Sequence, residues 1–227
     1  MRIASGTHQG LVRLKNEDAV AYDLEQGWAA LADGMGGLMA GREASEVAVL
    51  AVRRCFEQTP NAPATDALLA AHAAVKQFAE DNNYLGKTGT TLVVWTTAGF
   101  CHVGDSRIYH ASDGELTCLS RDQTVAERLV DEGIISPLEA LTSTKRHVLT
   151  QALGMPGQLR PESSHCPPRG RLLLCSDGLS DLVAHEVIAD ILFDRSLSMT
   201  DQVNALIKSA LDKGGRDNIS VVLIDRD

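Results

Sequence analysis

Acidic residues recur along this chain where an apolar run meets a glycine or an asparagine. Such a run predicts a strand, and the neighbouring glycine lets the backbone turn, so each carboxylate would lie at the rim of a sheet. Several carboxylates at one point repel each other unless a multivalent cation holds them. Oxygen ligands alone select a hard ion, Mg²⁺ or Mn²⁺, over zinc. The residues in question are Asp33, Asp105, Asp177 and Asp217, with Glu17 and Asp18 as two further carboxylates.

Each of these aspartates also has a simpler explanation. A lone Asp-Gly pair is usually a turn, because Asp hydrogen-bonds its own backbone and Gly supplies a positive φ. For any one of them taken alone, a turn is the better interpretation. Four such sites, together with Asn-Glu-Asp at 16–18, favour a shared metal site.

The apolar pattern predicts the elements that would carry these residues. Strands are expected at 3–8, 19–22, 28–32, 90–96, 100–103, 107–110, 172–175 and 219–224, and helices at 41–56, 65–81, 125–132, 184–193 and 200–212. The three strands between 90 and 110 would form an antiparallel meander. Because strands come in blocks and do not alternate regularly with helices, we expect an α+β layered domain. The polar segment 121–155 is the best candidate for a mobile surface segment near a site.

Length and charge narrow the function. The 227 residues show no repeat or linker, so we expect a single domain over 1–227. A net charge of −9 without a basic cluster argues against binding nucleic acid or an anionic membrane. An anionic substrate would therefore need a local positive charge such as a metal. The five cysteines without a CxxC pair, and the lack of a signal or membrane-spanning run, predict a cytoplasmic protein.

Seven motifs in chain order resemble those of bacterial members of the PPM, or type 2C, family of metal-dependent Ser/Thr protein phosphatases. They are Arg13-x-x-Asn-Glu-Asp18, Ala32-Asp-Gly-Met-Gly-Gly37, Gly89-Thr-Thr91, Val103-Gly-Asp-Ser-Arg107, Leu149-Thr-Gln-Ala-Leu-Gly154, Ser176-Asp-Gly-Leu-Ser-Asp181 and Gly215-Arg-Asp-Asn218. The resemblance covers the whole chain. It implies a four-layer α-β-β-α sandwich with two antiparallel sheets, in which the segment 121–154 forms a flap beside the active site.

The resemblance also implies a reaction and a metal centre. Phosphoserine and phosphothreonine would be hydrolysed by direct attack of a hydroxide that bridges two Mn²⁺ or Mg²⁺ ions. Asp33 would bridge both ions, and the Gly34 carbonyl would ligate one of them. Asp177 and Asp217 would hold the first ion.

The remaining roles follow from the same resemblance. Glu17 and Asp18 would act near the second ion, partly through water, and Asp105 would join Asp177 around a third, weaker ion. Arg13 would bind the substrate phosphate, which suits a planar bidentate donor. Asn218 would position ligands or water beside Asp217. The implied partners are phosphorylated proteins, among them a Ser/Thr kinase and its substrates.

One position departs from the family pattern. Many relatives have a histidine within or just after the Asp-Gly-x-Gly-Gly motif, thought in some to protonate the leaving alkoxide. Here Met35 and Leu38 stand at those positions, and neither donates a proton. Water on the metal, or a histidine from elsewhere, would have to serve. The candidates are His8, His72, His102, His110, His147, His165 and His185.

Two other functions fit parts of the sequence. Cys101 and Arg107 have the spacing of a cysteine phosphatase, C-x5-R, but that chemistry needs a helix after the loop, and a strand is expected there. A metal-binding or phospho-sensing module without turnover is the second alternative. The presence of all the carboxylates that the family uses for metal argues against it.

Overall fold

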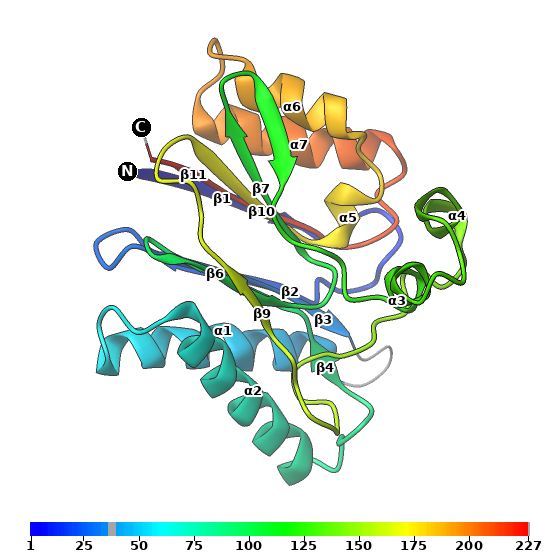
Figure 1. Cartoon of the computed structure of the whole chain (residues 1–227). Coiled ribbons are helices and arrows are strands. Elements are labelled where there is room, and N and C mark those ends of the chain that lie inside the picture. Colours follow the sequence, from blue (N-terminus) through cyan, green and yellow to red (C-terminus); the bar gives the residue numbers. More distant parts are fainter. Residues whose placement is uncertain (36–39, 227) are drawn as a thin grey trace.

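The computed structural model describes residues 1–35 and 40–226. Two antiparallel sheets pack face to face, and a pair of helices covers the outer face of each sheet (Figure 1). The resulting order of layers is α-β-β-α, which confirms the expected sandwich. No helix in the described ranges is both long and apolar enough to cross a bilayer.

The first sheet holds both ends of the described chain. Its strands, in spatial order, are β1 (Arg2–His8), β11 (Ile219–Asp225), β10 (Arg171–Cys175), β7 (Arg107–Ser112) and β8 (Glu115–Cys118). The outer face of this sheet is covered by α6 (His185–Phe193) and α7 (Met199–Asp212). A single turn of helix, α5 (Asp177–Ser180), follows β10 directly.

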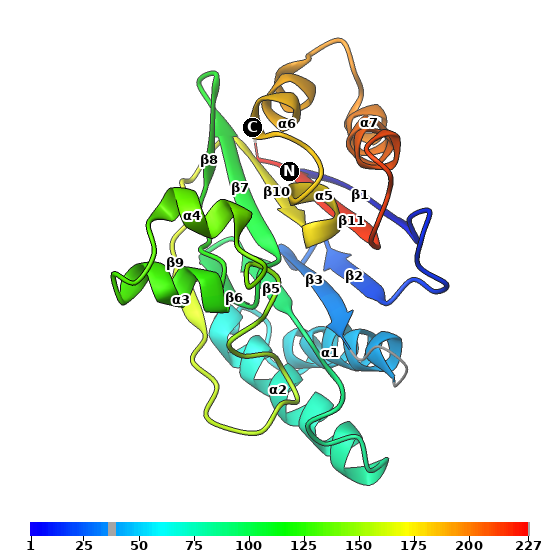
Figure 2. The same cartoon turned by 90° about the vertical axis from the view of Figure 1, so that its right-hand side faces the viewer.

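The second sheet is built from the N-terminal half of the chain and one later strand. Its order is β2 (Asp18–Asp23), β3 (Trp28–Met35), β5 (Leu92–Thr96), β6 (Gly99–Val103) and β9 (Glu162–Ser164), with β4 (Gly89–Thr90) paired to the end of β3. Two long helices cover its outer face, α1 (Gly41–Gln58) and α2 (Ala64–Asp81). Two short helices, α3 (Val125–Asp131) and α4 (Pro137–Thr142), lie at one end of the sandwich (Figures 1 and 2).

The core has three parts because side chains alternate along each strand. In β10, Leu173 and Cys175 face α6 and α7, whereas Leu172 and Leu174 point into the space between the sheets. Both faces are therefore buried, and the strand reads as a continuous apolar run. Each sheet is thereby held by packing on both sides, which makes its rim a firm support for polar residues.

One expectation about the strands is wrong. β5 and β6 form a hairpin in the second sheet, but β7 pairs with β10 in the first sheet, so the three strands are not a meander. The chain crosses between the sheets at 104–106. Gly104 has φ 107° there and packs so closely on Thr91 that a Cβ would lie 2.6 Å from its side chain. This crossing puts Asp105 at the rim where the two sheets meet.

Candidate metal centre

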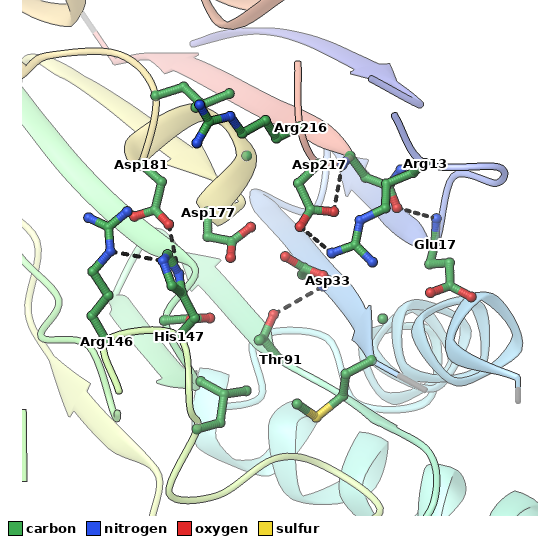
Figure 3. A pocket seen from close by; sticks show the side chains of 17 residues that line it. Arg13, Glu17, Asp33, Thr91, Arg146, His147, Asp177, Asp181, Arg216 and Asp217 are labelled. Carbon is green, nitrogen blue, oxygen red and sulfur yellow. Dashed lines mark hydrogen bonds and ion pairs between the residues drawn. The ribbon is translucent and has the colours of Figure 1, made fainter. Parts of the chain in front are cut away.

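A cavity of about 540 Å³ opens at one end of the sandwich, where loops from both sheets converge (Figure 3). It brings together carboxylates that are up to two hundred residues apart in sequence. Those that line it are Glu17, Asp33, Asp105, Asp177, Asp181 and Asp217. Asp18 lies buried beside them, opposite Asp33 in the β2–β3 register. The structure therefore gathers the acidic residues that the sequence singled out.

Asp33 is fixed by the strand that carries it and by the loop after β4. Its backbone N–H donates to Thr91 Oγ1 at 3.0 Å, and its carbonyl accepts from the Thr90 hydroxyl at 2.8 Å and from the Thr91 N–H at 2.9 Å. With its backbone held on both sides, Asp33 lines the cavity (Figure 3). The Gly89-Thr-Thr91 motif thus holds Asp33 at the cavity without supplying a carboxylate.

Gly34 is a glycine because the backbone is crowded there. A Cβ at this position would clash with the carbonyl oxygen of Gly41 and would lie 2.5 Å from that of Glu17. The Gly34 N–H donates to the same Glu17 carbonyl at 3.1 Å. The main chain at Gly34 therefore lines the cavity beside Asp33 with no side chain to cover it.

Asp177 is placed by the abrupt end of β10. The strand ends at Cys175, Ser176 is the N-cap residue, and Asp177 begins α5. The Ser176 hydroxyl donates to Asp18 Oδ2 at 2.9 Å and links the two sheets behind the cavity. Gly178 packs directly on the Asn218 carbonyl, where any Cβ would clash. The Ser-Asp-Gly sequence is thus required by packing as well as by charge.

Asn218 ties the N-terminal loop to the start of β11. Its Oδ1 accepts from the Glu17 N–H at 2.8 Å, and its Nδ2 donates to the carbonyls of Gln9 and Lys15, each at 2.8 Å. All three bonds hold the loop that carries Arg13 and Glu17. Asn218 therefore positions these two residues through the backbone of their loop.

Arg13 is the cation that lies closest to the carboxylates. Its Nη2 donates to Asp217 Oδ2 at 2.6 Å, while Asp217 Oδ1 accepts from the Asn218 N–H at 2.8 Å. The Asp217 bond raises the pKa of the guanidinium. About half of the Arg13 side chain is exposed. The guanidinium therefore keeps donors free for a ligand that enters the cavity.

Burial and mutual repulsion shift the acids strongly. Burial first, and then the neighbouring carboxylates, raise the pKa of Asp33 and of Asp177 well above the ordinary range. Burial also raises the pKa of Asp18 to about 6, that of Asp105 to about 7 with help from Asp122, and that of Glu17. Among the described residues that line the cavity, six carboxylates face three arginines, Arg13, Arg146 and Arg216.

Two carboxylate oxygens indicate whether a cation fits this site. Within the described ranges, Asp18 Oδ1 and Asp177 Oδ1 are buried and have no hydrogen-bond partner. A buried carboxylate oxygen without a donor is costly unless a metal ligates it. The atoms available as metal ligands are carboxylate and carbonyl oxygens, the set that Mg²⁺ and Mn²⁺ prefer. The residues present thus fit hard divalent ions.

Three further residues of the cavity received no specific role from the sequence: Arg146, Asp181 and His147, the last of which was one of the seven candidate histidines. His147 Nδ1 lies 2.9 Å from Asp181 Oδ2, and Arg146 Nε donates to His147 Nε2 at 2.8 Å. Because Nε2 accepts, the imidazole proton sits on Nδ1 and donates to Asp181. Among the described residues, His147 is the one histidine that lines the cavity. Met35 lines it as well, whereas Leu38 lies outside the described residues.

The cysteine phosphatase alternative fails on geometry. Cys101 is fully buried within β6, and burial raises the pKa of its thiol, the opposite of what a nucleophile needs. Arg107 lies in β7 of the other sheet and forms a bidentate pair with Asp122, at 2.6 and 2.8 Å. The two residues therefore form no phosphate-binding loop.

Comparison with known proteins gives an independent result. Residues 5–213 match the family model described as protein phosphatase 2C. The chain is 37% identical to the serine/threonine protein phosphatase PstP of Mycobacterium tuberculosis over 99% of its own length, and it spans 45% of that relative. It is 32% identical to the serine/threonine phosphatase stp of Listeria welshimeri, with 97% of this chain and 94% of the relative covered.

A solved structure shares the fold of this chain. The catalytic domain of PstP in complex with two manganese ions superposes with a TM-score of 0.83 at 36% identity, covering 99% of this chain and 97% of that one. A relative with this fold and level of identity thus binds two ions of the class that the oxygen ligands here prefer.

Proposed function

Since the chain belongs to the protein phosphatase 2C family, we propose that it is a metal-dependent phosphatase that hydrolyses phosphoserine and phosphothreonine in proteins. The observation that carries this proposal is the cavity at the sandwich rim, where carboxylates from both sheets outnumber the arginines that line it and two buried carboxylate oxygens have no hydrogen-bond partner among the described residues. Its partners would be phosphorylated proteins, including a Ser/Thr kinase and the substrates of that kinase.

Two divalent ions, Mn²⁺ or Mg²⁺, would occupy this cavity. Asp33 would contact both ions, Asp177 and Asp217 would hold the first, and the Gly34 carbonyl would ligate one of them. The second ion would lie on the Glu17 side, with Asp18 acting behind it. Asp33 and Asp177 are half-buried beside other carboxylates, and their raised pKa values support this assignment, because bound cations would relieve the repulsion.

A third, weaker ion would bind where Asp105 approaches Asp177. Each of these two carboxylates raises the pKa of a shared neighbour, Asp33, and Asp105 also raises that of Asp177. Asp105 is 8% exposed and lines the cavity, so its oxygen atoms are available to a ligand from that side.

The hydrolysis itself would need no covalent phosphoenzyme. Bound divalent ions supply charge neutralisation of the phosphomonoester and a water of lowered pKa as nucleophile. Arg13 would bind the phosphate through the guanidinium edge that does not face Asp217, and would orient it for in-line attack. Asn218 would keep Arg13 in reach by holding its loop. An acidic protein can in this way bind an anionic substrate.

Metal titration of phosphopeptide hydrolysis tests the proposal. We expect the wild type to hydrolyse a phosphothreonine peptide only with Mn²⁺ or Mg²⁺, and Asp33→Ala to lose this activity. Binding of Mn²⁺ without hydrolysis would instead identify a module without turnover. Activity of Asp33→Ala equal to that of the wild type would refute the bridging role of Asp33.

A further inference from the structure

A second hollow, of about 300 Å³, adjoins the cavity that the carboxylates line, called the metal cavity below. The two share Met35 and Leu149, so one continuous surface leads from the carboxylates into it. The rest of its wall comes from the stretch between α4 and β9, which passes β4 and loops beside α2 before it returns (Figures 1 and 2). Its further lining residues are Thr150, Gln151, Ala152, Met155, Pro156, Gly157, Gln158 and Leu159.

The chemistry of this hollow is the opposite of that of the metal cavity. None of the described residues that line it is charged, and most of the wall is apolar. Met35 and Met155 have flexible, polarizable side chains that adapt to apolar groups of different shape. The hollow therefore suits a large apolar side chain and offers nothing to hold a phosphate.

The wall is already fixed by hydrogen bonds. Gln151 Nε2 donates to Gln123 Oε1 and to the Arg160 carbonyl, each at 2.8 Å, and its Oε1 accepts from the Arg160 N–H at 2.8 Å. Leu153 exchanges backbone bonds with Thr90 at 2.9 and 3.3 Å. The bonds between Gln151 and Arg160 thus close the loop 151–160 at its base, and Leu153 joins this loop to β4. A preformed pocket loses less affinity to ordering when a ligand binds.

Spacing relates the hollow to the reacting group. Met35 follows Asp33 by two residues on β3, which is about 7 Å along a strand. In an extended peptide, side chains two residues apart also lie about 7 Å apart and point to the same face. A peptide whose phosphoresidue enters the metal cavity would therefore present its second neighbour on one side to the hollow.

We propose that this hollow binds a large apolar side chain, such as leucine or methionine, two residues from the phosphorylated serine or threonine of the substrate. The inference rests on the proposed phosphatase function and adds a sequence preference to it. A side chain that binds in the hollow removes its apolar surface from water. Phosphopeptides that carry it should therefore be hydrolysed about tenfold faster, measured as kcat/KM, than peptides with serine at that position.

The test compares phosphothreonine peptides in which one leucine is moved from three residues before to three residues after the phosphothreonine. With the Mn²⁺-loaded full chain, we expect kcat/KM to peak at one of the two positions that lie two residues away. Equal rates for all these peptides would refute the subsite and leave the phosphatase function standing. Hydrolysis of none of them would overturn the proposed function, and the subsite with it.

Substitutions locate the preference in the structure. Met155→Asp places a charge in the wall, and Pro156→Glu places one at the exposed lip, where the effect on folding is smaller. For either variant we expect the ratio between the leucine and serine peptides to fall to about one. A general loss of activity cancels in this ratio. The matched control is Leu138→Asp on α4, where the leucine is 76% exposed and outside the hollow, and there the ratio should persist. An unchanged ratio in both wall variants would contradict the assignment.

Discussion

Asp18 and Asp33 face each other directly across the antiparallel pair β2 and β3, at the end of the sandwich where the cavity opens. Like charges at opposed positions of neighbouring strands destabilise a sheet. The Ser176 hydroxyl donates one hydrogen bond to Asp18, which leaves Asp18 Oδ1 without a partner among the described residues. The folded protein thus holds a strained pair of acids that a divalent cation would stabilise.

The stability of the metal-free protein should therefore fall as pH rises. Burial raises the pKa of Asp18 from its ordinary 3.8 to about 6, so the folded state binds this proton more tightly than the unfolded chain. The stabilisation is complete below about pH 4 and is lost between pH 4 and 6; Asp105 extends the loss to about 7. For Asp18 and the acids that titrate with it, this shift corresponds to a loss on the order of 3 kcal/mol. Urea unfolding with EDTA at pH 5 and at pH 8 measures the difference.

Metal should reverse this trend. Because Mn²⁺ binds the ionised carboxylates of the folded state, the free energy of unfolding with saturating Mn²⁺ should rise from pH 5 to pH 8. Equal stability of the EDTA-treated protein at the two pH values would mean that these acids are not shifted as the structure indicates.

Replacing Asp33 should abolish tight metal binding. Asp33→Asn keeps the size of the side chain and removes the charge that the proposal places between two ions. Since loss of an outer-shell partner already weakens metal sites by about 10–100-fold, we expect a larger decrease here. Calorimetric titration with Mn²⁺ measures it without reference to activity. The control is Asp190→Asn, because Asp190 is an exposed aspartate on α6, which covers the outer face of the first sheet. Identical titrations for both variants would rule out the role of Asp33.

Asn218 offers a test of how the loop with Arg13 is held. Asn218→Ala removes three hydrogen bonds to the backbone of Gln9, Lys15 and Glu17. At about 1 kcal/mol for each bond, the free energy of unfolding should decrease by about 2–4 kcal/mol. Amide hydrogen exchange should increase at 9–17 more than elsewhere. A loss of stability without faster exchange in this loop would argue for a packing effect.

Regular patterns allowed most of the fold to be predicted from the sequence. Alternating or continuous apolar runs marked the buried strands, and the helical spacing of apolar residues marked α1, α2 and α7, because burial of one face is what defines these elements. β9 escaped prediction because its residues, Glu162–Ser164, are all exposed and polar. The position of β7 in the other sheet also escaped, since adjacency in sequence favours a hairpin, whereas the pairing of β7 with β10 depends on residues far apart in the chain.

The site divided in the same way. Carboxylates next to strand ends could be found, because each motif is local and the resemblance places it. Asp181 stands in one of those motifs but received no role, since its partner His147 comes from a segment without regular periodicity. Contacts between two irregular segments depend on how both loops fold, and no short-range pattern encodes them.

A thiol reagent distinguishes the metal mechanism from the C-x5-R alternative. Because burial raises the pKa of Cys101 and shields it within β6, iodoacetamide should leave phosphatase activity unchanged over the time in which EDTA abolishes it. Substitution of Cys101 by alanine, assayed with Mn²⁺, is the control for slow modification of other thiols. If iodoacetamide inactivated the protein through Cys101 and EDTA did not affect activity, the cysteine phosphatase mechanism would be supported instead.

Arg13 separates charge from geometry in phosphate binding. Its guanidinium donates to Asp217 at 2.6 Å and has further donors for a phosphate, whereas a lysine at this position would offer a single point charge. Hydrogen bonds to charged groups contribute about 1.5–3 kcal/mol, so Arg13→Ala should lower kcat/KM for a phosphopeptide by about 10–100-fold. Arg13→Lys should recover only part of this loss. Mn²⁺ affinity measured on the same variants identifies the cause, because a decrease in metal binding equal to the loss in kcat/KM would show that Arg13 acts on Asp217 and not on the phosphate.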